Sequence, residues 1–181
     1  QLTSDIVWLV EQSVTLPDGS TQKVLVPQVY LLPRSGDLKA DGTLIAGQTV
    51  SIRAAGDISN SGTVAGRTLL DLSAANIQNL GGRLTGKAVQ IAASNDINHL
   101  GGRIEAEDSL ALSAGRDINL ETSTVTGSGQ TEQGNFSRTQ IDRVAGLYVT
   151  GSGGSLSAVA GRNMTLTAAE VVNAGSGTTT L

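Results

Sequence analysis

The sequence repeats itself at intervals of 19 to 21 residues between Ala46 and Thr122. In each repeat an isoleucine follows an acid or an amide. The four successive pairs are Asp57-Ile58, Asn76-Ile77, Asp96-Ile97 and Asp117-Ile118. An alternating apolar run precedes each pair, and a glycine-containing turn follows the first three. A fixed period near twenty residues is typical of a solenoid, in which each repeat stacks on the one before it.

The internal pattern of each repeat is that of a strand. Val89, Ile91 and Ala93 alternate with polar or small residues, which is the two-residue period of a β-strand. No window shows a helical stripe, and frequent Gly, Ser and Thr disfavour helix interiors. The sequence therefore predicts an all-β fold, a parallel β-helix with a single-stranded solenoid of about 20 residues per coil.

The stacking of equal positions predicts which side chains face inward. One expected column contains Ile58, Ile77, Ile97 and Ile118, and a second contains Leu72, Ile91 and Leu112. Gln90 lies between two inward residues and should face water.

A leucine-rich repeat has a similar period and is the alternative fold. Leu70-Asp71-Leu72 followed by Asn76 comes close to its strand signature. The second half of such a repeat needs room for a helix or a helical turn, whereas here residues 78–83 read Gln-Asn-Leu-Gly-Gly-Arg. The β-helix is therefore favoured.

Composition limits the class of protein. One Trp, two Tyr and one Phe suit a thin core of stacked aliphatic residues better than a compact globule of 181 residues. The net charge of −4 is spread out and forms no basic patch, so we expect no nucleic-acid partner. The lack of cysteine excludes disulfides and thiolate metal sites, and it suits a chain that is exported unfolded. We expect the isolated chain to be a monomer.

Changes in the repeat pattern predict the domains. Residues 1–35 contain two apolar runs around a Pro-Asp-Gly-Ser turn, which predicts a β-hairpin and an extended segment, with Trp8 and Tyr30 capping the first coil. Coils should begin near Gly36 and occupy residues 36–181. No signal-like segment or apolar membrane-spanning run is present in these 181 residues.

The repeat is interrupted after Ile118. The next good match is the run Met164–Ala168 followed by Val171, which takes the place of the isoleucine 53 residues after Ile118. This gap predicts a protruding hairpin inserted at about 119–150, with a flexible tip from Thr126 to Asn135. We expect apolar residues of its arms to lie against the β-helix, or to meet a membrane or another chain. These residues are Ile141, Val144, Leu147 and Val149.

Three features of the sequence resemble a known family: the coil pattern, the opening segment Ser4–Val10 and the string Arg138–Gly151. They are similar to the haemagglutinin repeats of filamentous-haemagglutinin-like exoproteins, in particular the toxin-bearing effectors of contact-dependent growth inhibition (CdiA type). The resemblance covers nearly the whole chain.

The resemblance implies a secreted protein on the surface of a Gram-negative bacterium, exported by two-partner secretion through an outer-membrane transporter. The repeats would form part of a filament that delivers a C-terminal toxin to neighbouring bacteria, meeting the outer membrane or a receptor of the target cell. The alternatives are an adhesin that binds a receptor or glycan, and a polysaccharide lyase. The charged positions fall at turns without clustering, so we expect no enzyme activity.

A column of acids and amides could bind a metal or cap turns. Its expected members are Asp57, Asn76, Asp96, Asp117 and Glu170. A stack of carboxylates could hold Ca²⁺, but the nine-residue pattern of the calcium β-roll is not found here. Capping of backbone amides by side-chain oxygens is the favoured interpretation.

Three further positions carry side chains that could form a site. Arg83 and Arg103 follow paired glycines and could meet a sugar or a phosphate, or could simply be solvated charges. His99 is interpreted as a surface substitution at the position of Asn60 and Asn79, which should form an amide ladder. We therefore expect no catalytic, cofactor-binding or metal site, and no cofactor.

Overall fold

The computed structural model describes residues 6–15, 21–30, 43–131 and 134–181, which form two compact units, Gln1–Leu38 and Lys39–Leu181. In the first unit β1 (Ile6–Thr15) pairs antiparallel with β2 (Thr21–Tyr30), with Ile6 opposite Tyr30. The predicted hairpin is therefore present. The start of the coils near Gly36, and the side chains of Trp8 and Tyr30 that were predicted to cap them, lie outside what the structure describes.

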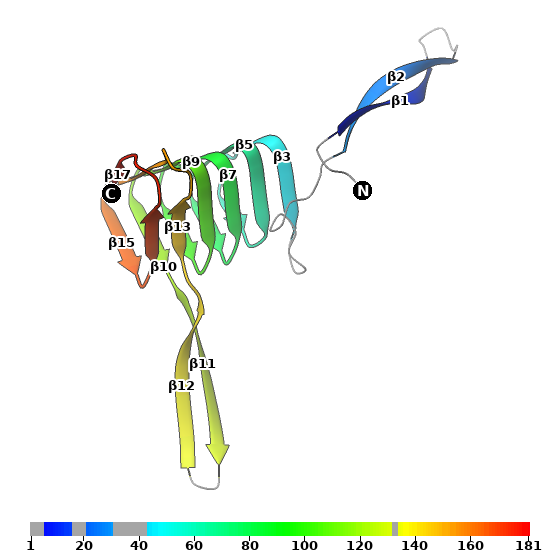
Figure 1. Ribbon diagram of the computed structural model, residues 1–181. Coiled ribbons are helices and arrows are strands. Elements are labelled where there is room, and N and C mark those ends of the chain that lie inside the picture. Colours follow the sequence, from blue (N-terminus) through cyan, green and yellow to red (C-terminus); the bar gives the residue numbers. More distant parts are fainter. Residues whose placement is uncertain (1–5, 16–20, 31–42, 132–133) are drawn as a thin grey trace. The chain divides into compact units, whose positions relative to one another are not determined.

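The second unit is a stack of parallel coils (Figure 1). Its strands are β3 (Leu44–Arg53), β4 (Ile58–Asn60), β5 (Thr63–Ala74), β6 (Ile77–Leu80), β7 (Arg83–Ala93), β8 (Ile97–Leu100), β9 (Arg103–Ala114), β10 (Asp117–Glu121), β11 (Ser123–Thr131), β12 (Gly134–Arg143), β13 (Gly146–Val149), β14 (Ser155–Ala160), β15 (Asn163–Thr167), β16 (Glu170–Asn173) and β17 (Thr179–Thr180). The predicted parallel β-helix is confirmed, with about six turns of about 21 residues each. The residues described include no helix, which rules out the leucine-rich alternative for this part of the chain.

Each coil has three sides. The first halves of β3, β5, β7 and β9 form the first side together with β13 and β16. Their second halves form the second side together with β14. The corner between the two sides coincides with an irregularity in each ladder, such as the register shift between Gly66 and Leu69. Strands β4, β6, β8, β10 and β15 form the third side.

Inward-facing side chains stack in columns that run along the solenoid. Ile58, Ile77, Ile97, Ile118 and Met164 pair in register on the third side. Leu72, Ile91, Leu112 and Ala158 do so on the second side. Ile97 is 1 % exposed and Gln90 is exposed, so the predicted strand register is confirmed.

The hairpin is shorter than predicted. Only β11 and β12 leave the stack, whereas Asn119–Glu121 belong to the coil strand β10 and Gly146–Val149 to the coil strand β13 (Figure 1). Leu147 and Val149 were expected on a hairpin arm, but they are buried in the core because they continue the columns of Ile104 and Ala106. Thr126–Thr131, expected to belong to a flexible tip, form a paired strand.

The chain returns to the stack in register. Met164, not Val171, takes the place of Ile118 in the next coil, while Val171 pairs with Leu147 on the first side. The buried Thr122 holds the two ends of the interrupted coil together. Its hydroxyl accepts a hydrogen bond from the Ala145 backbone N–H at 3.1 Å and donates one to the Ala168 carbonyl at 2.6 Å.

Candidate functional site

The column of acids and amides lies at the start of the third side, and its bonds cap backbone amides. The backbone N–H groups of Asp96, Asp117 and Asn163 each donate to a side-chain oxygen one coil earlier, at 3.3, 3.2 and 3.2 Å. Asn76 Nδ2 also donates to Asp57 Oδ1 at 2.7 Å. The capping interpretation is confirmed for this column.

Arginines from the next coil bind two carboxylates of the column. Arg116 donates two bonds to Asp96, at 3.1 and 2.6 Å. Arg162 holds both oxygens of Asp117, with its Nε at 2.9 Å from Oδ1. This hydrogen bond lowers the pKa of the Asp117 carboxyl to about 2. Among the residues with described side chains, no group of three or more His, Asp or Glu could hold a metal ion.

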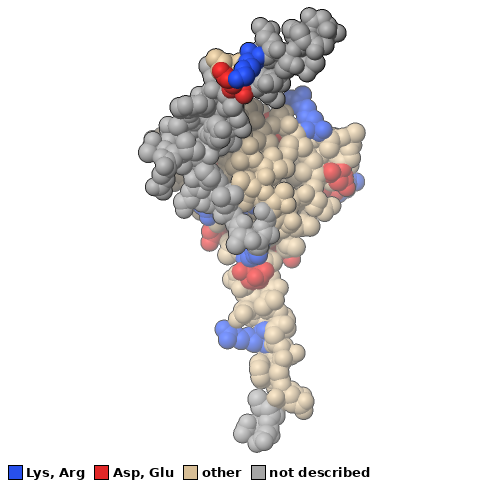
Figure 2. All heavy atoms as spheres, turned by 90° about the vertical axis from the view of Figure 1, so that its right-hand side faces the viewer, with Lys and Arg blue, Asp and Glu red and all other residues tan. Residues whose placement is uncertain are grey.

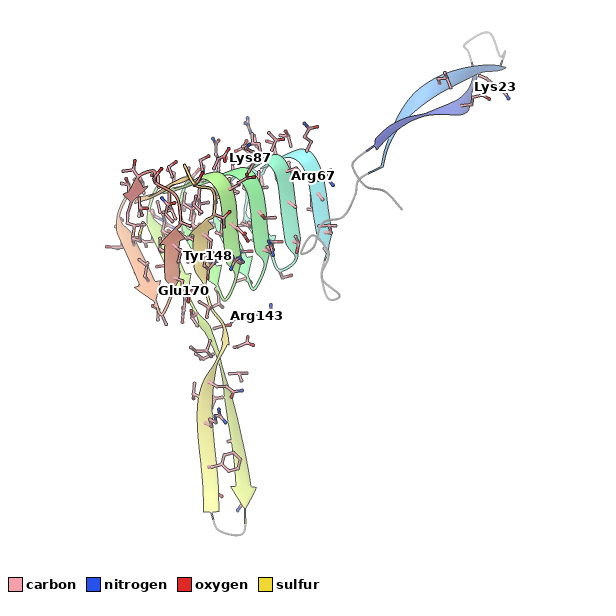
Figure 3. The ribbon with its side chains drawn as sticks, viewed as in Figure 1. Lys23, Arg67, Lys87, Arg143, Tyr148 and Glu170 are labelled. Carbon is pink, nitrogen blue, oxygen red and sulfur yellow. The ribbon has the colours of Figure 1, made fainter. Side chains whose placement is uncertain are left out.

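Glu170, expected in that column, lies elsewhere. It belongs to β16 on the first side, where it accepts a hydrogen bond from the Tyr148 hydroxyl at 2.7 Å (Figure 3). Asn163 occupies the column position predicted for Glu170. The sequence pattern had suggested Val171 for the isoleucine column, and Glu170, the residue before Val171, for the acid column.

Arg83 and Arg103 join Glu170 in a cluster that crosses four strands of the first side. Glu105 Oε2 accepts bonds from Arg83 at 3.1 Å and from Arg103 Nε at 2.8 Å. The Arg103 guanidinium stacks on the Tyr148 ring, 3.8 Å from its centroid. We call Arg83, Arg103, Glu105, Tyr148 and Glu170 the first-side cluster.

The polar groups of the first-side cluster are bonded to one another. Both guanidinium groups bind the Glu105 carboxylate, and the Glu170 carboxylate accepts the hydrogen bond of the Tyr148 hydroxyl. Burial, together with the hydrogen bond to Glu170, raises the pKa of Tyr148, so the phenol stays protonated. Arg103 covers one face of the ring on which a sugar could stack. The cluster therefore fastens β13 and β16 to the coils before the hairpin.

His99 is buried, so its interpretation as a surface residue is wrong. It is 1 % exposed, and its Nδ1 lies 2.9 Å from Asn79 Nδ2. Asn60 Nδ2 donates in turn to Asn79 Oδ1 at 2.7 Å, so the predicted amide ladder is confirmed. Leu120 pairs with His99 in the next coil, and this apolar residue at the same repeat position is the signal that could have shown that the column faces inward.

Burial lowers the pKa of His99 to about 4, although the backbone of Gly102 and Gly146 opposes the shift. Asn79 Nδ2 also donates to the Gly82 carbonyl at 2.9 Å, so its second hydrogen is the one directed to His99 Nδ1. His99 is then neutral with its proton on Nε2. This nitrogen makes no hydrogen bond of good geometry with the described residues.

The base of the hairpin lies on the paired glycines. Arg143 donates to the Gly81 carbonyl at 3.2 Å, and Ser123 Oγ donates to Asp142 at 3.1 Å. A Cβ added at Gly81 would lie 2.7 Å from Arg143, and one at Gly101 would lie 2.5 Å from the Ser123 hydroxyl. Both glycines also have positive φ, of 71° and 55°. The Gly-Gly corners thus make room for the hairpin.

Beyond its base the hairpin is solvent-exposed. Every residue of β12 is exposed, including Phe136 at 56 % and Ile141 at 63 %. Ile141 and Val144 were predicted to lie against the β-helix or to meet a membrane or another chain. Both present apolar surface to solvent, so the first alternative is not observed. On the face seen in Figure 2, charged side chains are sparse along the hairpin. No sequence-predicted site residue lies on it.

The comparison with protein families bears on the coils and the hairpin together. Residues 73–144 match the family described as Hemagglutinin repeat. The match supports a filamentous haemagglutinin-like repeat, and it runs from β5 to the end of the hairpin. Neither a curated protein nor a solved structure matches the chain significantly.

The hemagglutinin repeat is a structural or adhesin module rather than an enzyme. Proteins that carry it are typically secreted to the cell surface. In the described part of the chain there is no helix long and apolar enough to cross a membrane. A hemagglutinin repeat on a parallel β-helix points to a structural repeat of a filamentous haemagglutinin-like adhesin or exoprotein.

Proposed function

We propose that this chain is a structural repeat module of a large secreted exoprotein of contact-dependent growth inhibition, and that it forms part of a filament that presents a C-terminal toxin to neighbouring bacteria. The observation that carries the proposal is the hemagglutinin-repeat match on an in-register coil stack. The exoprotein would leave the cell through a two-partner secretion transporter and act at the surface of a Gram-negative bacterium.

The bonds between coils favour a load-bearing element. The acid and amide column and the first-side cluster both link successive coils through side chains, in addition to the backbone ladder. In a solenoid each coil contacts only its neighbours, so such links add stiffness along the stack without long-range contacts. A spacer of this kind depends on the regularity of its coils and not on the identity of any one of them.

Removal of one whole coil tests the proposal. Thr63 pairs with Arg83, so deletion of Thr63–Gly82 joins Gly62 to Arg83 with every inward column kept in register. In the intact exoprotein we expect this deletion to preserve surface display and killing of target cells. As a matched control, deletion of residues 63–72 removes less chain but breaks the register, and it should abolish both.

An adhesin whose binding surface lies on the deleted coil would give the opposite result for the first deletion. If the exoprotein without Thr63–Gly82 is displayed normally but no longer attaches to its target cells, a specific surface of that coil is required. The exposed hairpin favours this second function, because it offers surface that the coils do not need for stability. Direct binding of the purified chain to intact cells, with and without residues 124–142, separates the two.

A further inference from the structure

The hairpin has two open strand edges. β11 and β12 pair with each other, and no other strand in the described residues pairs with either. A two-stranded hairpin that buries no side chains is marginally stable in water. Its unpaired backbone groups along each edge favour the addition of a further strand.

The edge of β11 lacks the features that usually prevent such pairing. Its sequence, Ser-Thr-Val-Thr-Gly-Ser-Gly-Gln-Thr, contains no proline and no charged residue. The ladder with β12 is irregular only at the base, between Ser123 and Thr124. A nine-residue, uncharged strand at an open edge is a predicted pairing site.

The edge of β12 is protected by comparison. Arg138 lies in mid-strand, and Arg143 at the base is bonded to the Gly81 carbonyl. If two copies of β12 paired with each other, their Arg138 side chains would come close together, and like charges across a strand pair are unfavourable. Two copies of β11 meet no such repulsion.

We propose that β11 is a self-association edge, which pairs antiparallel with β11 of a second copy of this chain to form a four-stranded sheet. If the two copies are related by a two-fold axis normal to the sheet, the same face of each hairpin lies on the same side of the sheet. Val125, Gly127 and Gly129 alternate onto one face of β11, and Phe136 lies opposite Gly129. Val125 and Phe136, both half-exposed in the single chain, therefore lie on this face. This face gives the pairing an apolar contribution in addition to its backbone bonds.

The association is weak and concentration-dependent. One strand pair buries less than the roughly 1,000 Å² that a stable interface requires. We therefore expect a monomer in dilute solution and dimers where copies are concentrated. A covalent trap is the suitable probe, and the natural lack of cysteine makes any introduced thiol unique.

Ser128 and Ser137 form a matched pair for this experiment. They lie directly opposite each other in the hairpin, on the same face, and both are exposed. In the proposed sheet the two Ser128 residues lie on adjacent strands, whereas the two Ser137 residues are three strand spacings apart, about 14 Å. Full-length Ser128→Cys and Ser137→Cys chains are treated with a bis-maleimide that spans less than this second distance.

We expect cross-linked dimer from Ser128→Cys that increases with protein concentration, and much less from Ser137→Cys. Equal yields, or a greater yield from Ser137→Cys, would overturn the proposal. In the same way Ser128→Lys should abolish the concentration dependence seen by sedimentation, while Ser137→Lys should largely keep it. A chain that stays monomeric and untrapped at millimolar concentration would also overturn it, and would leave a strand of another protein as the occupant of the edge.

Discussion

At the scale of single residues, the structure depends on what each coil places in its inward columns. Most columns are apolar, but the one that contains Asn60, Asn79 and His99 carries polar groups into the core. These groups are tolerated because each amide is hydrogen-bonded to the next coil or to its own turn. His99 is the last polar member, and Leu120 follows it.

His99 should make stability depend on pH. Its pKa is about 4 in the folded chain and near 6.5 when unfolded, so only the unfolded state binds a proton between these values. Stability is then full above pH 6.5 and falls by about 3 kcal/mol as the pH drops to 4. Urea unfolding from pH 7.5 to 4 should show this loss.

His99→Asn is the matched control, because it extends the amide ladder without a titrating group. We expect the variant to lack most of the loss between pH 6.5 and 4. Asp117 does not interfere in this window, since its lowered pKa affects stability only as the pH falls from about 4 towards 2. Equal pH dependence of the two chains would show that His99 is not the group responsible.

A second prediction concerns the isoleucine column. Ile97 is buried against Ile77 and Ile118, so Ile97→Ala should destabilise the chain by about 2 to 5 kcal/mol. Gln90 is exposed, and Gln90→Ala should change the free energy of unfolding by less than about 0.5 kcal/mol. Similar losses for both variants would contradict the observed strand register.

At the scale of elements, the return of the chain after the hairpin is the critical step. β13 must find β9 again after an excursion of two strands, and the first-side cluster marks the correct place. Gly146 permits this contact, because a Cβ there would lie 2.2 Å from the Tyr148 ring. The absence of a side chain at Gly146 lets Tyr148 lie close to the backbone and reach both Arg103 and Glu170.

Gly146→Ala should therefore displace the Tyr148 ring and cost about 1 to 2 kcal/mol, through loss of the cation–π contact and the charged hydrogen bond. In a Tyr148→Ser background the same substitution should cost much less, since there is no ring to displace. A double-mutant cycle measured by urea unfolding checks this coupling. Additive losses would mean that the ring moves aside without penalty.

The sequence was sufficient to predict the coils because their period and their two-residue alternation agree with each other. Both columns that it predicted, and the outward position of Gln90, are observed. The bounds of the hairpin were harder to predict, because a break in the repeat shows only that the chain leaves the stack. The point at which the chain re-enters the stack could have been recognised from Gly161-Arg162-Asn163-Met164. This segment matches Gly115-Arg116-Asp117-Ile118 and places Met164 in the isoleucine column.

The first-side cluster could not be predicted in the same way. Arg83 and Arg103 are one coil apart and were identified as a pair. Their partner Tyr148 follows the hairpin in sequence, so only the register of the returning strand brings it to Glu105. The contact depends on a long-range pairing that no local pattern encodes.

At the scale of the coil stack, charged groups are used in bonds between coils. The carboxylates that could have bound calcium cap amides or meet arginines instead. We therefore expect the melting temperature to be the same with added Ca²⁺ and with a chelator, as measured by circular dichroism at 222 nm or below. An increase of several degrees on adding Ca²⁺ would show that the acid column binds the metal.

The in-register return of the chain at Gly146 has a consequence for how proteins of this architecture can change over time. Because Gly146 stacks on Arg103 in the place that an uninterrupted coil would use, the solenoid is indifferent to the length of what lies between Thr122 and Ala145. Insertions and deletions at this corner are nearly neutral for folding, whereas the same changes within a coil would shift every column above them. We expect sequence diversity in related chains to collect at this corner, where one hairpin can be exchanged for another without disturbing the coils.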